Sequence, residues 1–171
     1  GVYECTLKGK RLATGRDEYA ALAPGDRVSV QVVSEQHHHG VIDRLLERDS
    51  IFSRWNNKRN RAQVFAANVD RVLCVTSPTE PPFRERFVDR VLVAAEWHAL
   101  DVTVVLNKID LGTPDSVALS IDTIKEIGYE VVTCSAESGA GLDRLRDLIL
   151  HRRSVLVGQS GVGKSSLLNR L

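Results

Sequence analysis

The chain has 171 residues, of which 43% are hydrophobic, 5% aromatic and 26% charged, and its formal net charge is +1. This composition is typical of a globular protein with a buried core and excludes a disordered or fibrous chain. No apolar run approaches the ~20 residues of a membrane span, so we expect no membrane association, and the near-neutral charge favours no class of partner.

Three cysteines occur, each in an apolar, strand-like stretch and in no close-spaced motif: Cys5, Cys74 and Cys134. Such cysteines behave as small buried hydrophobic residues, so we expect free thiols in a reducing cytosol. No charged-then-apolar leader opens the sequence, which gives no indication of export. The chain contains no methionine and ends a few residues into a predicted helix, so we expect it to be part of a longer protein.

Alternating apolar and polar residues predict short strands in the first part of the chain: Val2–Leu7, Arg27–Val33, Gly40–Leu46 and, more weakly, Ser50–Arg54. A turn sequence at 23–26 precedes the second of them. Short strands at this spacing favour a small antiparallel barrel or sandwich. Residues 1–66 fit best as an RNA-binding domain with a five-stranded OB-type barrel that lacks its first strand.

Three consecutive histidines, His37–His39, fall between the second and third predicted strands. Consecutive residues point in different directions, and no cysteine or carboxylate is spaced to complete a tetrahedral site. A metal site is therefore the weaker interpretation, and a solvated loop tip is the better one.

A basic run lies between residues 50 and 67. It holds four cations and no carboxylate, with three aromatic residues interleaved: Arg54, Lys58, Arg59 and Arg61, with Phe52, Trp55 and Phe65. This pattern suits a nucleic-acid backbone with unstacked bases, and a solvated basic linker explains it about equally well. We favour RNA because OB barrels present a sheet face and loops to it.

Residues 67–171 alternate between predicted strands and helices. The strands are 71–76, 102–106, 129–134 and 154–157, and the helices are 83–99, 116–127 and 142–150. The strands are continuous apolar runs, as in a parallel sheet that is covered on both faces. This part of the chain is therefore predicted to be a three-layer α/β domain with a mostly parallel sheet.

A phosphate-binding sequence follows the last strand. Gly158–Ser165 fits G-x-x-x-x-G-K-[ST] at every fixed position, between a strand and an apolar helix. Its glycines let backbone N–H groups approach a phosphate. Lys164 is placed to reach the β- and γ-phosphates, and the Ser165 hydroxyl is placed to hold Mg²⁺. The motif predicts binding of a nucleoside triphosphate.

A base-binding sequence, Asn107-Lys108-Ile109-Asp110, follows the strand 102–106 at its carboxyl end, where open α/β sheets bind ligands. Asp110 can accept hydrogen bonds from the ring N1–H and the exocyclic amine of guanine, a donor pair that adenine lacks. Asn107 can bond the other edge of the base and join adjacent loops, and the Lys108 stem can lie along the ring. Losing two such bonds, at ~1–3 kcal/mol each, would reject ATP by on the order of 10²–10⁴.

The next strand ends in the same way, at Cys134-Ser135-Ala136. The Ala136 N–H could bond the guanine carbonyl oxygen, and Ser135 could brace the loop. Lys164 is also the candidate catalytic residue. The full set of predicted nucleotide-binding residues is Asn107, Lys108, Asp110, Ser135, Ala136, Gly158, Gln159, Ser160, Gly161, Val162, Gly163, Lys164, Ser165 and Ser166.

The order of these motifs is unusual. Ordinary GTPases have the phosphate-binding loop first, whereas N-K-x-D and Ser-Ala precede it here, as joining the old termini and cutting elsewhere would produce. The chain therefore reads as a circularly permuted GTPase. This order, together with the predicted N-terminal barrel and the sequence 158–166, resembles the RsgA (YjeQ) family of ribosome-assembly GTPases over nearly the whole chain.

The resemblance implies a cytoplasmic, monomeric bacterial GTPase that binds the small ribosomal subunit and its rRNA late in maturation and is stimulated by the subunit. The family continues with switch segments, including D-x-x-G, and with a C-terminal domain that would hold Zn²⁺. The water-positioning group and the second Mg²⁺ ligand are expected there, so we expect at most residual nucleotide binding and no hydrolysis from these 171 residues. The segment 56–63 departs from the family's short join.

Two other functions remain open. An RNA-binding assembly factor could use GTP and GDP only to set its affinity for the ribosome, without appreciable turnover. An ATP-dependent kinase is disfavoured by Asp110, because adenine offers that carboxylate no matching pair of donors.

Overall fold

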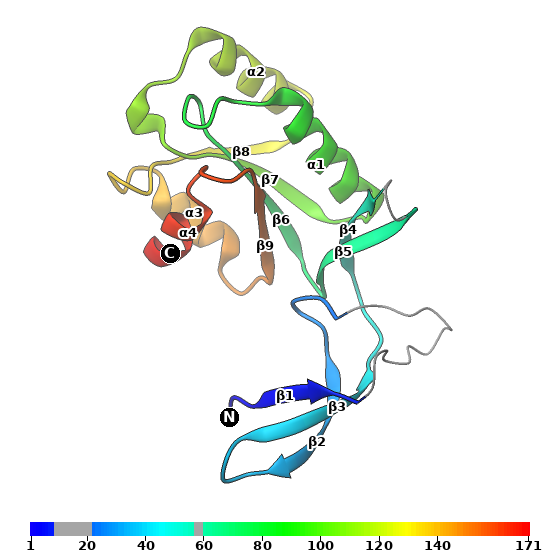
Figure 1. Cartoon of the computed structure of the whole chain (residues 1–171). Helices are drawn as coiled ribbons and strands as arrows, with labels where there is room; N and C mark the ends of the chain where they lie inside the picture. The colour runs from blue at the N-terminus through cyan, green and yellow to red at the C-terminus, as the bar shows by residue number, and fades with distance from the viewer. Residues whose placement is uncertain (9–21, 57–59) are drawn as a thin grey trace. The chain divides into compact units, whose positions relative to one another are not determined.

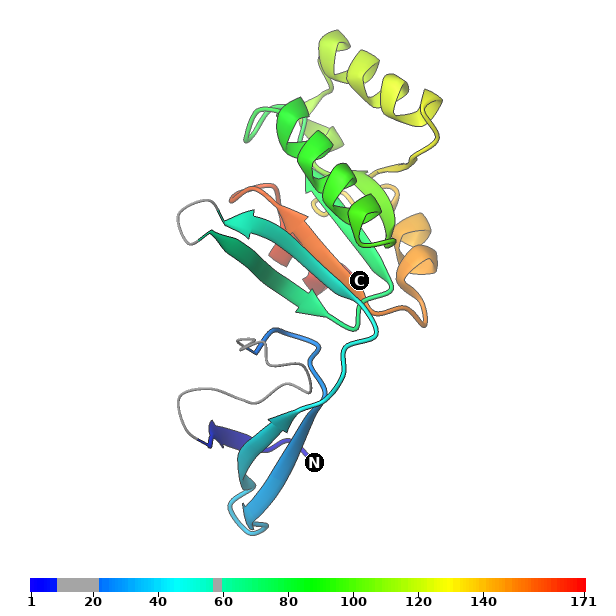
Figure 2. The same cartoon turned by 90° about the vertical axis from the view of Figure 1, so that its right-hand side faces the viewer.

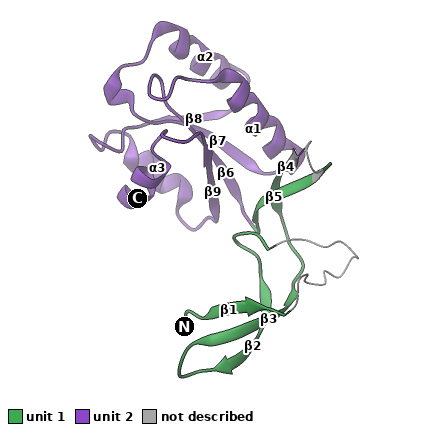
Figure 3. Ribbon diagram, viewed as in Figure 1, with its two compact units in different colours: residues 1–68 green, residues 69–171 purple. Residues whose placement is uncertain are grey.

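The computed structural model describes residues 1–8, 22–56 and 60–171, without the side chains of 55, 56 and 61. The chain divides into two compact units, residues 1–68 and 69–171 (Figure 3). Among the described residues, no helix is both long enough and apolar enough to cross a membrane.

The described residues of the first unit form five strands in two sheets (Figure 1). The strands are β1 (Glu4–Leu7), β2 (Val28–Ser34), β3 (His39–Leu45), β4 (Ile51–Asn56) and β5 (Arg61–Ala67). β1, β3 and β2 form one sheet in that order, and β4 pairs with β5 in the other. The predicted OB-type barrel is not confirmed, because the described strands form two separate sheets. The expectation of an antiparallel arrangement is wrong for β1, which pairs with β3 in parallel.

Polar contacts join the two sheets of this unit. The buried Asn68 side chain accepts a hydrogen bond from the Asp49 N–H (2.8 Å) and donates one to the Gly25 carbonyl (2.9 Å). The nearby Asp26 carboxylate accepts two hydrogen bonds from the Arg48 guanidinium, at 2.6 and 2.8 Å. These bonds satisfy polar groups that burial would otherwise leave without partners.

The described residues of the basic run form two paired antiparallel strands, β4 and β5, and not a linker. Of the aromatic residues that suggested contact with unstacked bases, Phe52 is not accessible: it is 3% exposed and packs against Phe65 with ring centroids 6.2 Å apart. The exposed Arg54 lies over Phe65, 5.0 Å from the ring centre. Lys58 and Arg59, and the side chains of Trp55 and Arg61, lie outside the described residues.

The histidines 37–39 lie at the predicted loop tip: His37 and His38 are exposed in the turn between β2 and β3, and His39 begins β3. His38 contacts the Tyr3 ring edge-on, with centroids 5.3 Å apart. Within the described ranges, no group of three or more His, Cys, Asp or Glu side chains is placed to hold a metal ion.

The second unit is the predicted α/β domain. Its strands are β6 (Arg71–Thr76), β7 (Asp101–Leu106), β8 (Glu130–Thr133) and β9 (Ser154–Gly158). Its helices are α1 (Glu85–Trp97), the short 3₁₀ helix η1 (Ile109–Leu111), α2 (Asp115–Glu126), α3 (Leu142–Ile149) and α4 (Lys164–Arg170). The order β8-β7-β6-β9, parallel at every pairing, confirms the predicted parallel sheet.

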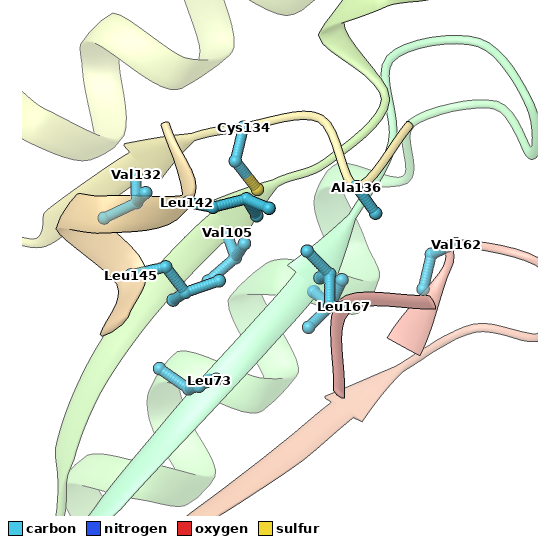
Figure 4. Close-up of a cluster of buried hydrophobic side chains, with 10 residues drawn as sticks. Leu73, Val105, Val132, Cys134, Ala136, Leu142, Leu145, Val162 and Leu167 are labelled. Atoms are coloured by element: carbon cyan, nitrogen blue, oxygen red, sulfur yellow. The ribbon is translucent and has the colours of Figure 1, made fainter. Parts of the chain in front are cut away.

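Helices cover both faces of this sheet, with α1 and α2 on one face and α3 and α4 on the other (Figures 1 and 2). Val72, Leu73, Cys74 and Val75 of β6 have no exposed surface, although successive residues face opposite sides. A strand that is buried on both faces must be apolar throughout, which explains this run. Figure 4 shows the cluster of buried side chains on the α3–α4 face.

An ion pair links the residues that precede β6 and β9, at the end of the sheet opposite the predicted site. The Arg153 guanidinium and backbone N–H both donate to the Asp70 carboxylate, at 2.9 and 2.8 Å, and these hydrogen bonds lower the pKa of Asp70 below 3.8. A carboxylate with a lowered folded-state pKa stabilises the fold above its unfolded-state pKa, and this contribution is lost as the pH falls through the folded-state value.

We therefore expect Asp70→Asn to lower the melting temperature at neutral pH, and the difference from wild type to shrink as the pH falls below 3.8. Thermal melts over a pH series measure this. Asp143→Asn is the control, because the Asp143 side chain is 97% exposed and pairs only at the surface with Arg146. A deficit that is the same at neutral and acidic pH would show that the Asp70 charge contributes nothing.

Candidate nucleotide-binding site

Three loops meet at the carboxyl end of the parallel sheet. The register aligns the ends of the strands, with Thr76 opposite Leu106 and Leu106 opposite Thr133, while Gly158 pairs with Val75 one residue earlier. The loops that follow β7, β8 and β9 carry the predicted base-binding and phosphate-binding residues. The parallel pairing therefore brings to one edge motifs that lie about fifty residues apart in sequence.

Asn107 joins all three loops. Its Nδ2 donates to the Val162 carbonyl (2.9 Å) in the loop after β9. Its Oδ1 accepts the Ala136 N–H (3.0 Å) and lies 3.8 Å from the Cys134 sulfur. Burial raises the pKa of the Cys134 thiol to about 12, which keeps the S–H as a donor. Asn107 is 1% exposed, so the amide acts as an internal tie, as predicted.

Two glycines of the phosphate-binding motif, one at the end of β9 and one just before α4, are required by close approaches. A Cβ at Gly163 would lie 2.4 Å from Asn107 Nδ2, and the φ of Gly163 is +91°, which side chains rarely adopt. A Cβ at Gly158 would lie 2.4 Å from the Val75 carbonyl oxygen. The motif's glycines therefore also allow this loop to pack against its neighbours.

Ser135 braces the base-binding loop, as predicted. Its hydroxyl donates to Oδ1 of the exposed Asp110 carboxylate and accepts the Ser138 N–H (3.0 Å). The expectation for Ala136 changes, because its N–H already donates to Asn107. A guanine oxygen at this position would have to share that hydrogen with the Asn107 amide.

Lys108 lies between two loops in the left-handed backbone conformation, with φ of 66°. Its ammonium donates to the Glu80 carbonyl (2.8 Å) in the proline-rich loop after β6, and its Cε lies 3.8 Å from the position of a Cβ on Gly163. The stem therefore passes beside the loop after β9. Sequence reasoning missed the Glu80 contact, since a backbone carbonyl leaves no signal in a sequence.

Lys164 begins α4, and its ammonium donates to the carbonyls of Gly158 (3.0 Å) and Gln159 (2.7 Å). The amine therefore lies over the loop that its own motif forms. Ser165 and Ser166 follow in the first turn of α4 and are exposed, as is Ser160 in the loop. Gly161 adopts φ +85° and lies beside Pro81, at 3.6 Å from its Cδ to the position of a Cβ.

Arg170, the last residue of α4, also contacts the site, and sequence reasoning missed it. Its guanidinium donates to the carbonyls of Ala136 (2.8 Å) and Glu137 (2.7 Å) in the loop after β8. An arginine near a helix end is common on any surface, so the sequence carries no signal for this contact.

The chain is similar to proteins of one known family. A family model described as RsgA GTPase matches residues 45–171. The chain is 39% identical to the small ribosomal subunit biogenesis GTPase RsgA of Borrelia recurrentis, over 98% of this chain and 53% of that protein. It is 39% identical to the protein of the same name from Chlorobaculum parvum, over 88% of this chain and 50% of that protein.

Two solved structures resemble the chain. The crystal structure of YjeQ from Thermotoga maritima has a TM-score of 0.67 and 31% identity, over 97% of this chain and 55% of that one. The structure of YloQ, described as a circularly permuted GTPase, has a TM-score of 0.58 and 29% identity, over 98% and 54%. The chain spans about half the length of the relatives it matches. Because the family model covers most of it, the chain belongs to the RsgA GTPase family.

Proposed function

We propose that the chain binds a guanine nucleotide where the loops after β7, β8 and β9 meet, and that the complete protein hydrolyses GTP. The observation that carries this proposal is the Asn107 amide, which bonds both the Val162 carbonyl and the Ala136 N–H. It ties the phosphate-binding loop to both loops predicted to read the base. One nucleotide can then touch all three loops.

Asp110 would read the base. Its carboxylate is exposed, and Ser135 holds one of its oxygens. Both oxygens keep lone pairs that can accept the guanine N1–H and exocyclic amine. Adenine lacks this donor pair, so the carboxylate would be left unpaired against it. The second N–H of the Asn107 Nδ2 could serve the opposite edge of the base.

The loop after β9 would bind the phosphates. Its N–H groups and the Lys164 ammonium would stabilise negative charge that develops as water attacks the γ-phosphate. Lys164 now donates to two backbone carbonyls, and phosphate oxygens would replace these acceptors. The exposed Ser165 hydroxyl is a hard oxygen ligand next to Lys164 and fits Mg²⁺, which would neutralise phosphate charge when bound.

The relatives are named small ribosomal subunit biogenesis GTPases, so we infer that the complete protein acts on the small subunit. We further propose that it acts in the cytoplasm as a monomer, late in the maturation of the subunit, and that the subunit stimulates it. Residues 1–68 would contact rRNA, and the exposed guanidinium of Arg54 is available to a phosphate. Zn²⁺ belongs to the proposal only for the family's C-terminal domain.

Two assays on the complete protein test this proposal. GDP should bind at least on the order of 10²-fold more tightly than ADP in a titration with labelled nucleotide. Phosphate release from GTP should rise sharply when small ribosomal subunits are added. Equal affinity for ADP would refute guanine recognition, and nucleotide-dependent subunit binding without phosphate release would instead identify an affinity switch.

A further inference from the structure

The last residue of helix α4 is hydrogen-bonded to the loop after β8, which contains Ser135 and Ala136. The Arg170 guanidinium donates to two consecutive carbonyls, those of Ala136 (2.8 Å) and Glu137 (2.7 Å). Hydrogen bonds from a charged donor are stronger than neutral ones. Two of them from one planar group fix both the position and the orientation of the loop backbone.

Contacts with helix α3 and with the buried core fix the backbone around Arg170. Arg146 of α3 donates to the Arg170 carbonyl (2.6 Å) and to the Asp143 carboxylate (2.8 Å). Leu167, one turn earlier in α4, has no exposed surface and packs in the cluster that also contains Ala136 and Val162 (Figure 4). Arg170 therefore lies on a helix that Leu167 anchors in the core, and its side chain bonds the loop after β8.

The loop that Arg170 holds controls the base-reading groups. It contains Ser135, which orients the Asp110 carboxylate, and Ala136, whose N–H binds Asn107. The helix that carries Arg170 begins with Lys164, the proposed phosphate-binding residue. Arg170 thus connects the two halves of the site by a second route, independent of the Asn107 amide.

We propose that Arg170 is a positioning residue for guanine recognition, which holds the loop after β8 in register with the phosphate-binding start of α4. This inference rests on the proposed function. Arg170 touches neither base nor phosphate. Its loss lets the 135–138 turn shift, so that Asp110 loses its orientation while the phosphate contacts remain.

The test compares GDP with inosine diphosphate, which lacks only the exocyclic amine that Asp110 is expected to bind. In the complete protein, Arg170→Gln should weaken GDP binding about tenfold and inosine diphosphate binding much less, so that the ratio of the two affinities falls. Arg170→Lys, which keeps a charged donor, should lie between wild type and Arg170→Gln. It also provides the measurement if Arg170→Gln does not fold.

Arg144→Gln is the matched control. It removes the same charge from the same domain, but Arg144 bonds Glu130 (2.6 Å) and its side chain is 64% exposed. This variant should keep the wild-type ratio. A wild-type ratio in both Arg170 variants, or an equal fall in Arg144→Gln, would overturn the inference while GDP binding by the wild type stands. If the wild type bound no GDP, the proposed function would fall and this inference with it.

Discussion

Replacing Asp110 with asparagine is expected to exchange the guanine preference for a xanthine preference. The carboxylate offers two acceptors to the N1–H and amine of guanine, whereas an amide offers one acceptor and one donor. Xanthine has an N1–H donor beside a carbonyl acceptor, which matches the amide. We expect GDP affinity to fall by on the order of 10²-fold and xanthosine diphosphate to bind more tightly than GDP.

The measurement is a titration of the Asp110→Asn protein with both diphosphates, beside the wild type. Asp115→Asn is the control, because it removes the same charge from an exposed residue at the start of α2, five residues further along the chain. It should leave the order of affinities unchanged. An Asp110→Asn protein that kept GDP as its tighter ligand would show that this carboxylate does not read the base.

The Asn107→Ala variant is expected to lose both stability and nucleotide binding. The substitution leaves the Val162 carbonyl and the Ala136 N–H without their partner in a buried site. Each unsatisfied group costs about 1–3 kcal/mol, and the small side chain adds a cavity. The phosphate-binding loop is also released from both base-reading loops, so GDP affinity should fall together with the free energy of unfolding.

Denaturant unfolding and GDP titration measure the two effects. Thr103→Val is the matched control, because Thr103 is buried in β7, the strand that precedes Asn107, and its hydroxyl donates to Glu130 (3.3 Å), away from the three loops. It should lose less stability and keep its GDP affinity. If Asn107→Ala bound GDP as tightly as Thr103→Val, the amide would not be the tie that assembles the site.

The second unit was largely predictable because its sequence patterns are local and strong. The run 71–76 is apolar throughout, since both of its faces are buried, and the sheet edge follows from parallel pairing. The N-K-x-D and phosphate-binding motifs were found because their fixed residues are tied to chemistry. Asn107 was predicted to join loops, and the contacts with Val162 and Ala136 are those bonds.

The first unit was harder to predict because its pairing depends on distant residues. β5 was missed because residues 62–67 are apolar apart from Gln63 and show no clear alternation, and Phe52 was grouped with the aromatic residues that suit unstacked bases although it packs on Phe65. The parallel partner of β1 lies more than thirty residues away. Backbone carbonyls such as those of Glu80 and Ala136 are present at every residue and give no sequence signal. The contacts of Lys108 and Arg170 with them could therefore be found only in the structure.

The most direct test of this account is an experimental structure of the complete protein with GDP and Mg²⁺ bound. We expect the Asp110 carboxylate within hydrogen-bond distance of the guanine N1 and exocyclic amine, and the Lys164 ammonium on the β-phosphate of the same nucleotide. A GDP that meets Lys164 while its base lies away from Asp110, or that binds elsewhere, would contradict the claim that three loops of one sheet edge form a guanine nucleotide site.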